Sequence, residues 1–141
     1  MILLDTSGLL AALFSDQRQH EECARALRES SPPRVISPFV LAELDYLITK
    51  YAGVPAEVAL LEEIERGAYE LAMFDEFNVA KAREIIERYS DLNVGLADAS
   101  IVVLADVHDV RDVLTLDERH FRALRPSPRK RFRILPADGW R

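Results

Sequence analysis

The first seven residues, Met1-Ile2-Leu3-Leu4-Asp5-Thr6-Ser7, guide the interpretation of the whole chain. Three apolar residues lead directly into an acid and two hydroxyl side chains, and a helical pattern begins at Leu9. A short apolar run that meets turn-forming residues is typical of a buried strand in a parallel sheet. Such a strand places Asp5 at its carboxyl end, where open α/β sheets bind ligands. Taken alone, Asp5 is better explained as a cap of the next helix, so the decision depends on other acids.

Length and composition indicate one globular domain spanning residues 1–141. The chain has 49% apolar and 30% charged residues, which are globular values, and it is long enough to bury a core. No apolar run has the length of a membrane span, and no basic and apolar leader precedes Ile2, so we expect a cytoplasmic protein with no membrane contact. The single Cys23 excludes an internal disulfide framework and is expected to pack in a helix.

Charge is unevenly distributed along the chain. Residues 125–141 contain six cations and one acid, a net charge of +5, so the first 124 residues carry −11 of the total of −6. An acidic body does not bind nucleic acid through bulk charge, but it can hold cations. We expect the basic segment to contact a phosphate backbone through Arg129, Lys130 and Arg131, and the alternative of a solvated terminus is equally compatible.

Short apolar runs alternate with helical patterns along the sequence, which predicts βαβ units, an α/β fold and a mainly parallel sheet. Strands are predicted at residues 2–4, 34–36, 69–74, 112–116 and, as a last edge strand, 132–135. Helices are predicted at residues 6–14, 15–30, 39–52, 55–67, 75–89, 96–107 and 117–124.

Asp98 is the strongest single signal for a functional site. It lies in Leu96-Ala97-Asp98-Ala99-Ser100-Ile101-Val102-Val103-Leu104-Ala105, a helix that is apolar nearly all round and is therefore expected to be buried. An ionised carboxylate there needs a partner, and no Lys or Arg follows within two turns. A metal ion fits this requirement, and the alternative is an acid favoured by the helix dipole.

Glu43 and Asp117 occupy comparable places. Glu43 lies early in the helix over 39–52, beside a buried stripe that includes Val40 and Leu44, where an unpaired acid is unfavourable. Asp117 follows the strand over 112–116, which repeats the arrangement around Asp5. Each acid also has an explanation that involves no function. The helix dipole favours an acid at the position of Glu43, and Asp117 can serve as a helix cap. Taken together, these alternatives require four acids to collect at strand ends and helix starts by accident.

Carboxylates without a supporting Cys or His pattern favour hard cations, Mg²⁺ or Mn²⁺. Such ions activate water and stabilise the leaving oxygen in phosphoryl displacement, so the four acids predict phosphodiester hydrolysis. Nearby hydroxyls are expected to orient the carboxylates or their waters: Thr6, Ser7 and Thr115. The three histidines, His20, His108 and His120, share no metal-ligand spacing and are interpreted as surface or local contacts.

Four stretches together resemble the PIN-domain nucleases, and more closely the VapC-type toxins of bacterial toxin–antitoxin pairs. They are Asp5-Thr6-Ser7, Glu43, Gly95-Leu96-Ala97-Asp98-Ala99, and Thr115-Leu116-Asp117-Glu118-Arg119-His120-Phe121. Each motif is short, but the four occur in the family's order, and the likeness covers essentially the whole chain.

The resemblance implies a three-layer fold with a five-stranded, mainly parallel sheet flanked by about seven helices. It also implies an Mg²⁺- or Mn²⁺-dependent endoribonuclease that forms a homodimer and binds a cognate VapB-type antitoxin, whose tail fills a groove beside the site. Carried over by position, the catalytic and metal-binding acids are Asp5, Glu43, Asp98 and Asp117. The supporting hydroxyls are Thr6, Ser7 and Thr115.

Two other functional classes compete with a nuclease. A phosphatase with Asp5 as covalent nucleophile needs a second acid two residues later, where this chain has Ser7. A PIN-like module that binds RNA or protein without catalysis is compatible with the sequence, although the intact set of four acids argues against it. Metal affinity separates such a module from a nuclease.

Overall fold

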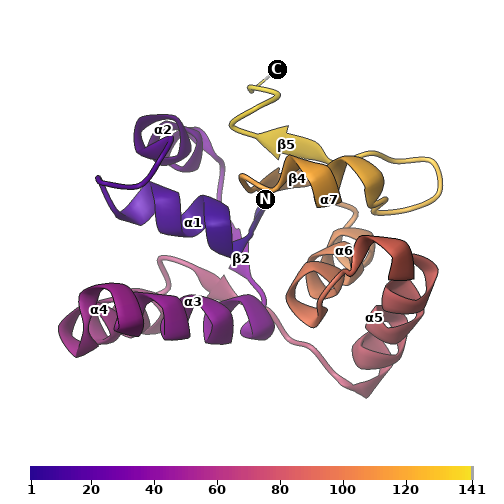
Figure 1. The fold of residues 1–141 in the computed structure, drawn as a ribbon, viewed down its shortest axis with the longest axis horizontal. Coiled ribbons are helices and arrows are strands. Elements are labelled where there is room, and N and C mark those ends of the chain that lie inside the picture. The colour runs from indigo at the N-terminus through magenta and orange to yellow at the C-terminus, as the bar shows by residue number, and fades with distance from the viewer. Residues whose placement is uncertain (141) are drawn as a thin grey trace.

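The computed structural model describes residues 1–140, which form one five-stranded sheet and seven α-helices (Figure 1). The strands are β1 (Ile2–Leu4), β2 (Arg34–Ile36), β3 (Glu70–Leu71), β4 (Asp112–Leu114) and β5 (Arg133–Leu135). All neighbouring strands pair in parallel, in the order β3-β2-β1-β4-β5. The predicted fold class is therefore confirmed, including the last edge strand.

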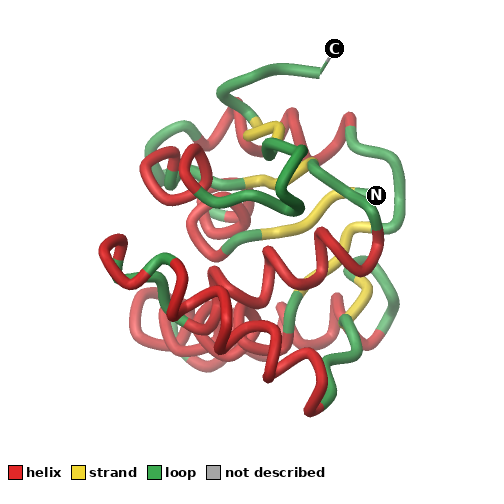
Figure 2. The backbone as a smooth tube through the Cα atoms, turned by 90° about the vertical axis from the view of Figure 1, so that its right-hand side faces the viewer, coloured by secondary structure: helices red, strands yellow, loops and turns green. Residues whose placement is uncertain are grey.

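The helices follow the predicted sequence of elements. They are α1 (Thr6–Leu13), α2 (His20–Glu29), α3 (Pro38–Ala52), α4 (Val54–Glu65), α5 (Glu76–Arg88), α6 (Leu96–His108) and α7 (Glu118–Ala123), with a 3₁₀ turn, η1, at Ser90–Leu92. Figure 1 shows α1 beside α2, α3 beside α4, and α5 beside α6, and Figure 2 shows the strands between helices on both sides. No helix within residues 1–140 has the length and apolar character needed to cross a membrane.

β1 is the central strand of the sheet, and all three of its side chains are apolar and buried. It pairs with β2 on one side and β4 on the other. The chain builds outward from β1 to β2 and β3, then returns to add β4 and β5 on the opposite side, so the strand order reverses between β1 and β4. A ligand crevice is expected at that reversal, outside the carboxyl ends of the two strands.

Local sequence signals determine where two helices begin. Ser37 caps α3 by accepting hydrogen bonds from the backbone N–H groups of Phe39 and Val40, and Pro38 occupies the first turn, where its missing N–H is not needed. Asp75 caps α5 in a reciprocal arrangement with Asn78, each side chain accepting from the other residue's backbone N–H.

Several predicted boundaries differ from the observed ones, most clearly those of α2, β3 and β4. α2 begins at His20 rather than at residue 15, because residues 14–19 form turns that end with Gln19 at a left-handed φ of 60°. The strand predicted at 69–74 is reduced to two exposed residues at the sheet edge. β4 stops at Leu114 because the N–H groups of Leu116 and Asp117 donate to side-chain hydroxyls instead of to a neighbouring strand.

Candidate active site

Asp5 lies at the carboxyl end of β1, as predicted, and the structure places this strand end at the strand-order reversal. Its side chain is buried, and the residue is only 5% exposed. One carboxylate oxygen, Oδ2, accepts hydrogen bonds from Thr115 Oγ1 at 2.6 Å and from Ser7 Oγ at 3.0 Å. Burial raises the pKa of Asp5 above its ordinary value, these hydrogen bonds lower it in part, and the charge of Glu43 raises it further.

Hydroxyl side chains connect the ends of β1 and β4. Ser7 Oγ and Thr115 Oγ1 lie 3.2 Å apart. Ser7 Oγ accepts from the backbone N–H of Leu116 at 3.0 Å, and Thr115 Oγ1 accepts from that of Asp117 at 2.9 Å. The two hydroxyls therefore orient Asp5 and at the same time fix the backbone that leads into Asp117.

Removing the Thr115 hydroxyl is expected to destabilise this junction. Thr115→Val deprives buried Asp5 of its shortest hydrogen bond and leaves the Asp117 N–H without its acceptor, so we expect a loss of about 1–3 kcal/mol in the free energy of unfolding. Thr115→Ser keeps the hydroxyl and is the control, with an expected loss under about 1 kcal/mol. Urea denaturation measures both, and a valine variant as stable as the wild type would contradict the role given to Thr115.

Asp98 lies in the first turn of α6 and faces the same crevice. Its side chain is 19% exposed, so it is less buried than the surrounding apolar sequence predicts. Burial, together with the charges of Asp5 and Asp117, raises the pKa of Asp98 to about 6, and His120 opposes this increase. The influence of Asp5 and Asp117 on Asp98 indicates that acids from three different elements converge.

His120 joins two of these acids, which corrects its interpretation as a surface or local contact. Its Nδ1 lies 3.1 Å from Asp98 Oδ2 and 2.9 Å from Asp117 Oδ2, and its Nε2 lies 2.9 Å from the backbone oxygen of Leu92. Both ring nitrogens therefore face oxygen atoms, so His120 connects α7 to Asp98 on one side and to η1 on the other.

Sequence reasoning looked for histidines spaced like metal ligands and so missed His120. The informative signal was local instead. His120 stands three residues after Asp117, and Asp117 caps α7 by accepting from the His120 backbone N–H at 3.1 Å. Three residues along a helix return a side chain to the same face, so an acid at the cap and a histidine at the third position meet in space.

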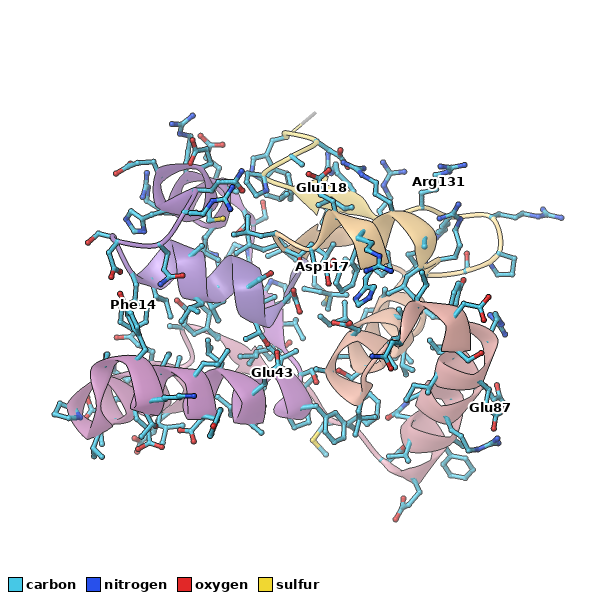
Figure 3. The ribbon with its side chains drawn as sticks, viewed as in Figure 1. Phe14, Glu43, Glu87, Asp117, Glu118 and Arg131 are labelled. Carbon is cyan, nitrogen blue, oxygen red and sulfur yellow. The ribbon has the colours of Figure 1, made fainter. Side chains whose placement is uncertain are left out.

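Glu43 is placed differently from the expectation. It is an exposed residue of α3 rather than an acid packed beside the core stripe. In Figure 3 it lies below α1, with Asp117 above it at the start of α7. Its connection to the other acids is electrostatic, through its effect on the pKa of Asp5, and within residues 1–140 it makes no ion pair. The structure thus brings Asp5, Asp98 and Asp117 together and connects Glu43 to them only through its charge near Asp5.

The three basic residues proposed for RNA contact lie outside the acidic centre. Arg129 and Arg131 are exposed, and Lys130 is ion-paired with Asp109. In Figure 3, Arg131 lies at the outer edge of the view, toward the end of α7 that is farther from Asp117. These side chains can meet only an RNA that extends beyond the site.

Comparison with protein-family models matches residues 2–125 to the PIN domain. The ribonuclease VapC26 of Mycobacterium tuberculosis is 43% identical over 135 residues, which cover 96% of this chain and all of that protein. This chain belongs to the PIN domain family, in its VapC branch. The match extends across the acids described above, from Asp5 to Asp117.

Solved structures show that the fold is shared. Mycobacterium tuberculosis VapC20, described as a sarcin–ricin loop cleaving toxin, superposes with a TM-score of 0.77 at 20% identity, covering 83% of this chain and 90% of that one. A toxin–antitoxin complex from Klebsiella pneumoniae gives a TM-score of 0.69 at 21% identity, covering 92% and 99%.

The residues at the centre of this PIN domain can hold a metal ion. Ligand atoms of Asp98, Asp117 and His120 lie within 4.8 Å of one another. Within residues 1–140, Thr6 Oγ1 is a buried oxygen without a hydrogen-bond partner, next in sequence to Asp5, and such an atom calls for a water or an ion's hydration shell. Burial is the main cause of the raised pKa values of Asp5 and Asp98, with a smaller contribution from neighbouring acids, and a bound cation would favour the ionised form of both carboxylates.

Proposed function

We propose that this PIN domain is a metal-dependent endoribonuclease and the toxin of a type II toxin–antitoxin pair. The observation that supports this most directly is the convergence of Asp5, Asp98 and Asp117 at the strand-order reversal. Ligand atoms of Asp98 and Asp117 lie within 4.8 Å of one another, and Thr115 Oγ1 donates to Asp5 Oδ2 while it accepts from the Asp117 N–H. Nearly full-length similarity to a VapC ribonuclease supports RNA as the substrate. We further propose that the chain acts in the cytoplasm and that residues 1–141 form a single domain, since β5 completes the sheet beside β4.

In this proposal the position of each of the four acids determines its role in binding the metal. The direct metal ligands would be Asp98 and Asp5, whose carboxylate is held by Ser7 and Thr115. Asp117 would lie beside them, and Glu43 would add negative charge near Asp5. A bound Mg²⁺ or Mn²⁺ would supply a more acidic water and stabilise charge on the phosphate oxygens. Carboxylate oxygens suit both ions, and the adjacent imidazole is more compatible with Mn²⁺ than with Mg²⁺.

Cleavage of total cellular RNA by purified, antitoxin-free protein tests the proposal. Reactions contain Mg²⁺, Mn²⁺ or a chelator. Discrete fragments that depend on the metal support the nuclease, and mapping their ends identifies the RNA. If no RNA is cut and calorimetry detects no metal binding, the chain is a binding module rather than an enzyme.

The phosphatase alternative is disfavoured by the surroundings of Asp5. A covalent nucleophile needs an accessible carboxylate oxygen and a second acid two residues later. Here Asp5 is buried, two hydroxyls already donate to its Oδ2, and the position two residues later is Ser7, one of those donors.

Exposed apolar side chains support the two proposed protein contacts, one with an antitoxin and one with a second copy of this chain. On α3, α4 and the end of α1, large apolar residues face solvent, as expected for a surface that an antitoxin covers: Leu13, Tyr46, Tyr51, Val54, Val58 and Leu61. Met73 and Phe77, near the start of α5, are 90% and 78% exposed and provide apolar surface for a homodimer. Sedimentation of the protein alone and with its antitoxin reports both assemblies.

Neutralising three cations of the basic segment at residues 125–141 is expected to weaken RNA binding without affecting metal binding. Changing Arg129, Lys130 and Arg131 to glutamine removes three cations outside the acidic centre. Each phosphate contact on a single strand contributes about 0.7 to the slope of log affinity against log salt, so losing three contacts would reduce the slope by about 2. Fluorescence anisotropy with labelled RNA measures the slope, and an unchanged value would mean that the tail is only a solvated terminus.

A further inference from the structure

A second hollow lies away from the acidic centre, between α5, α6 and the loop at residues 125–128. Its volume is about 460 Å³, within the range of small-ligand sites. Its floor includes the core side chains of Ile85, Val102 and Val103, and Tyr89 forms part of its wall. An apolar floor with an aromatic wall suits a flat ring such as a nucleobase.

Three cations line this hollow: Lys81, Arg88 and Arg125. Within residues 1–140 none of them is in an ion pair, whereas Arg83, on the same helix as Lys81 and Arg88, pairs with Glu87. Two acids, Glu84 and Asp106, also line the hollow, which leaves one net positive charge there in a chain of net charge −6. Lys81 and Arg88 are exposed, so both cations are free to contact an anionic ligand at this hollow.

Arg125 is held in position by the end of α7. Its Nη1 donates to the backbone oxygens of Arg122, Ala123 and Leu124 at 2.9, 3.3 and 3.4 Å. A guanidinium has five N–H donors, so anchoring one nitrogen leaves others for a ligand. Because the side chain is already ordered, binding an anion through it loses little side-chain entropy.

The elements that build the hollow also carry the catalytic acids. On α6, Val102 and Val103 follow Asp98 by four and five residues, which is about 6–7.5 Å along the helix axis. Arg125 follows the end of α7, a helix whose cap is Asp117. Tyr89 immediately precedes η1, whose Leu92 oxygen contacts His120. A single strand that leaves the acidic centre along α6 and α7 therefore reaches the hollow within a few nucleotides.

We propose that this hollow is a second RNA subsite, which binds a nucleotide a few positions from the cleaved phosphate. The base lies on the apolar floor beside Tyr89, and neighbouring phosphates contact Lys81, Arg88 and Arg125. The inference rests on the proposed ribonuclease function. RNA is favoured over a protein segment because the cations are unpaired and the walls continue directly into the elements that carry the catalytic acids.

The test uses binding of labelled, random-sequence RNA by the full chain in an Asp98→Asn background, which prevents cleavage. Lys81→Gln/Arg88→Gln removes two cations of the hollow. Arg66→Gln/Arg83→Gln removes two cations that pair with glutamates elsewhere and is the matched control. For RNA of about twelve nucleotides, we expect the first pair to lower affinity about tenfold and to reduce the salt slope by about 1.4, and the control to change affinity less than twofold.

Other outcomes would overturn the subsite. If both double variants lose RNA affinity equally, the loss comes from bulk charge and not from the hollow. If neither loses affinity, RNA does not occupy the hollow and a protein segment becomes the better candidate. The proposed function is judged separately by cleavage with the wild type. If the wild type cleaves RNA and the two double variants have the same RNA affinity, the subsite is excluded and the nuclease function is supported. If only Lys81→Gln/Arg88→Gln loses RNA affinity and the wild type shows no metal-dependent cleavage, the RNA subsite is supported and the nuclease function is excluded.

Discussion

Asp98→Asn is expected to abolish RNA cleavage and, at neutral pH without metal, to make the folded chain more stable. The substitution removes the charge at almost constant volume and leaves a side chain that still reaches His120. Losing a metal ligand removes several kcal/mol of transition-state stabilisation, which corresponds to a loss of about a thousandfold or more. The cleavage assay with Mn²⁺ measures this loss, and full activity in a folded variant would exclude the proposed site.

The stability gain follows from the raised pKa of Asp98. Its pKa is about 6 in the folded chain and 3.8 as the ordinary value, so above pH 6 the ionised carboxylate disfavours the folded state by on the order of 3 kcal/mol. As pH falls from about 6 toward 4, the folded chain takes up the proton first and this penalty disappears. The difference between variant and wild type should therefore be largest above pH 6 and should close in acid.

Thermal unfolding across pH, with and without Mn²⁺, measures this behaviour. Asp16→Asn, at an exposed acid between α1 and α2, is the control and should change stability by less than about 0.5 kcal/mol. Metal should raise the melting temperature of the wild type and of the control but not of Asp98→Asn, because only a site that binds the ion gains stability from it. An asparagine variant that is less stable than the wild type at pH 7 would mean that the contact with His120 outweighs the burial of charge.

Gly8→Ala is expected to destabilise the chain by about 3 kcal/mol or more. Gly8 lies in α1, where helix propensity alone predicts that alanine stabilises by roughly 0.5–1 kcal/mol. The tertiary structure predicts the opposite sign. A Cβ at Gly8 would lie 2.4 Å from the Leu114 carbonyl oxygen and 2.8 Å from the Thr115 nitrogen, which are backbone atoms at the end of β4. Because these atoms cannot rotate away, α1 has to move from the sheet.

Gly95→Ala is the matched control for Gly8→Ala. Gly95 caps α6 at a φ of −87°, which alanine adopts readily, and a Cβ there meets nothing within 4 Å. Its unfolding free energy should change by less than about 0.5 kcal/mol. Gly8→Ala should also reduce cleavage, because moving α1 separates Ser7 from Thr115. A Gly8→Ala variant that gains stability would show that α1 does not pack on β4 as closely as described.

The order of the elements and the position of Asp5 were predictable because the signals are local. Three consecutive apolar residues predicted the buried strand Ile2–Leu4, and its burial on both faces made it central. Ser37 with Pro38, and Asp75, fixed the starts of α3 and α5 through bonds within four residues. Boundaries failed where side-chain contacts replaced strand pairing, as after β4, where the N–H groups of Leu116 and Asp117 donate to hydroxyls.

The sequence by itself determined the α/β architecture and the three acids that follow β1, open α6 and cap α7, since these depend on short-range periodicity and capping. Only the tertiary structure brought Asp98 to His120, which already lies beside Asp117 on the same helix, and joined Asp5 to Thr115 across 110 residues. It also assembled the cationic hollow from α5, α6 and a loop. The physical reason is that these contacts join residues far apart in the chain, whose meeting is decided by how the elements pack and not by the propensity of any one of them.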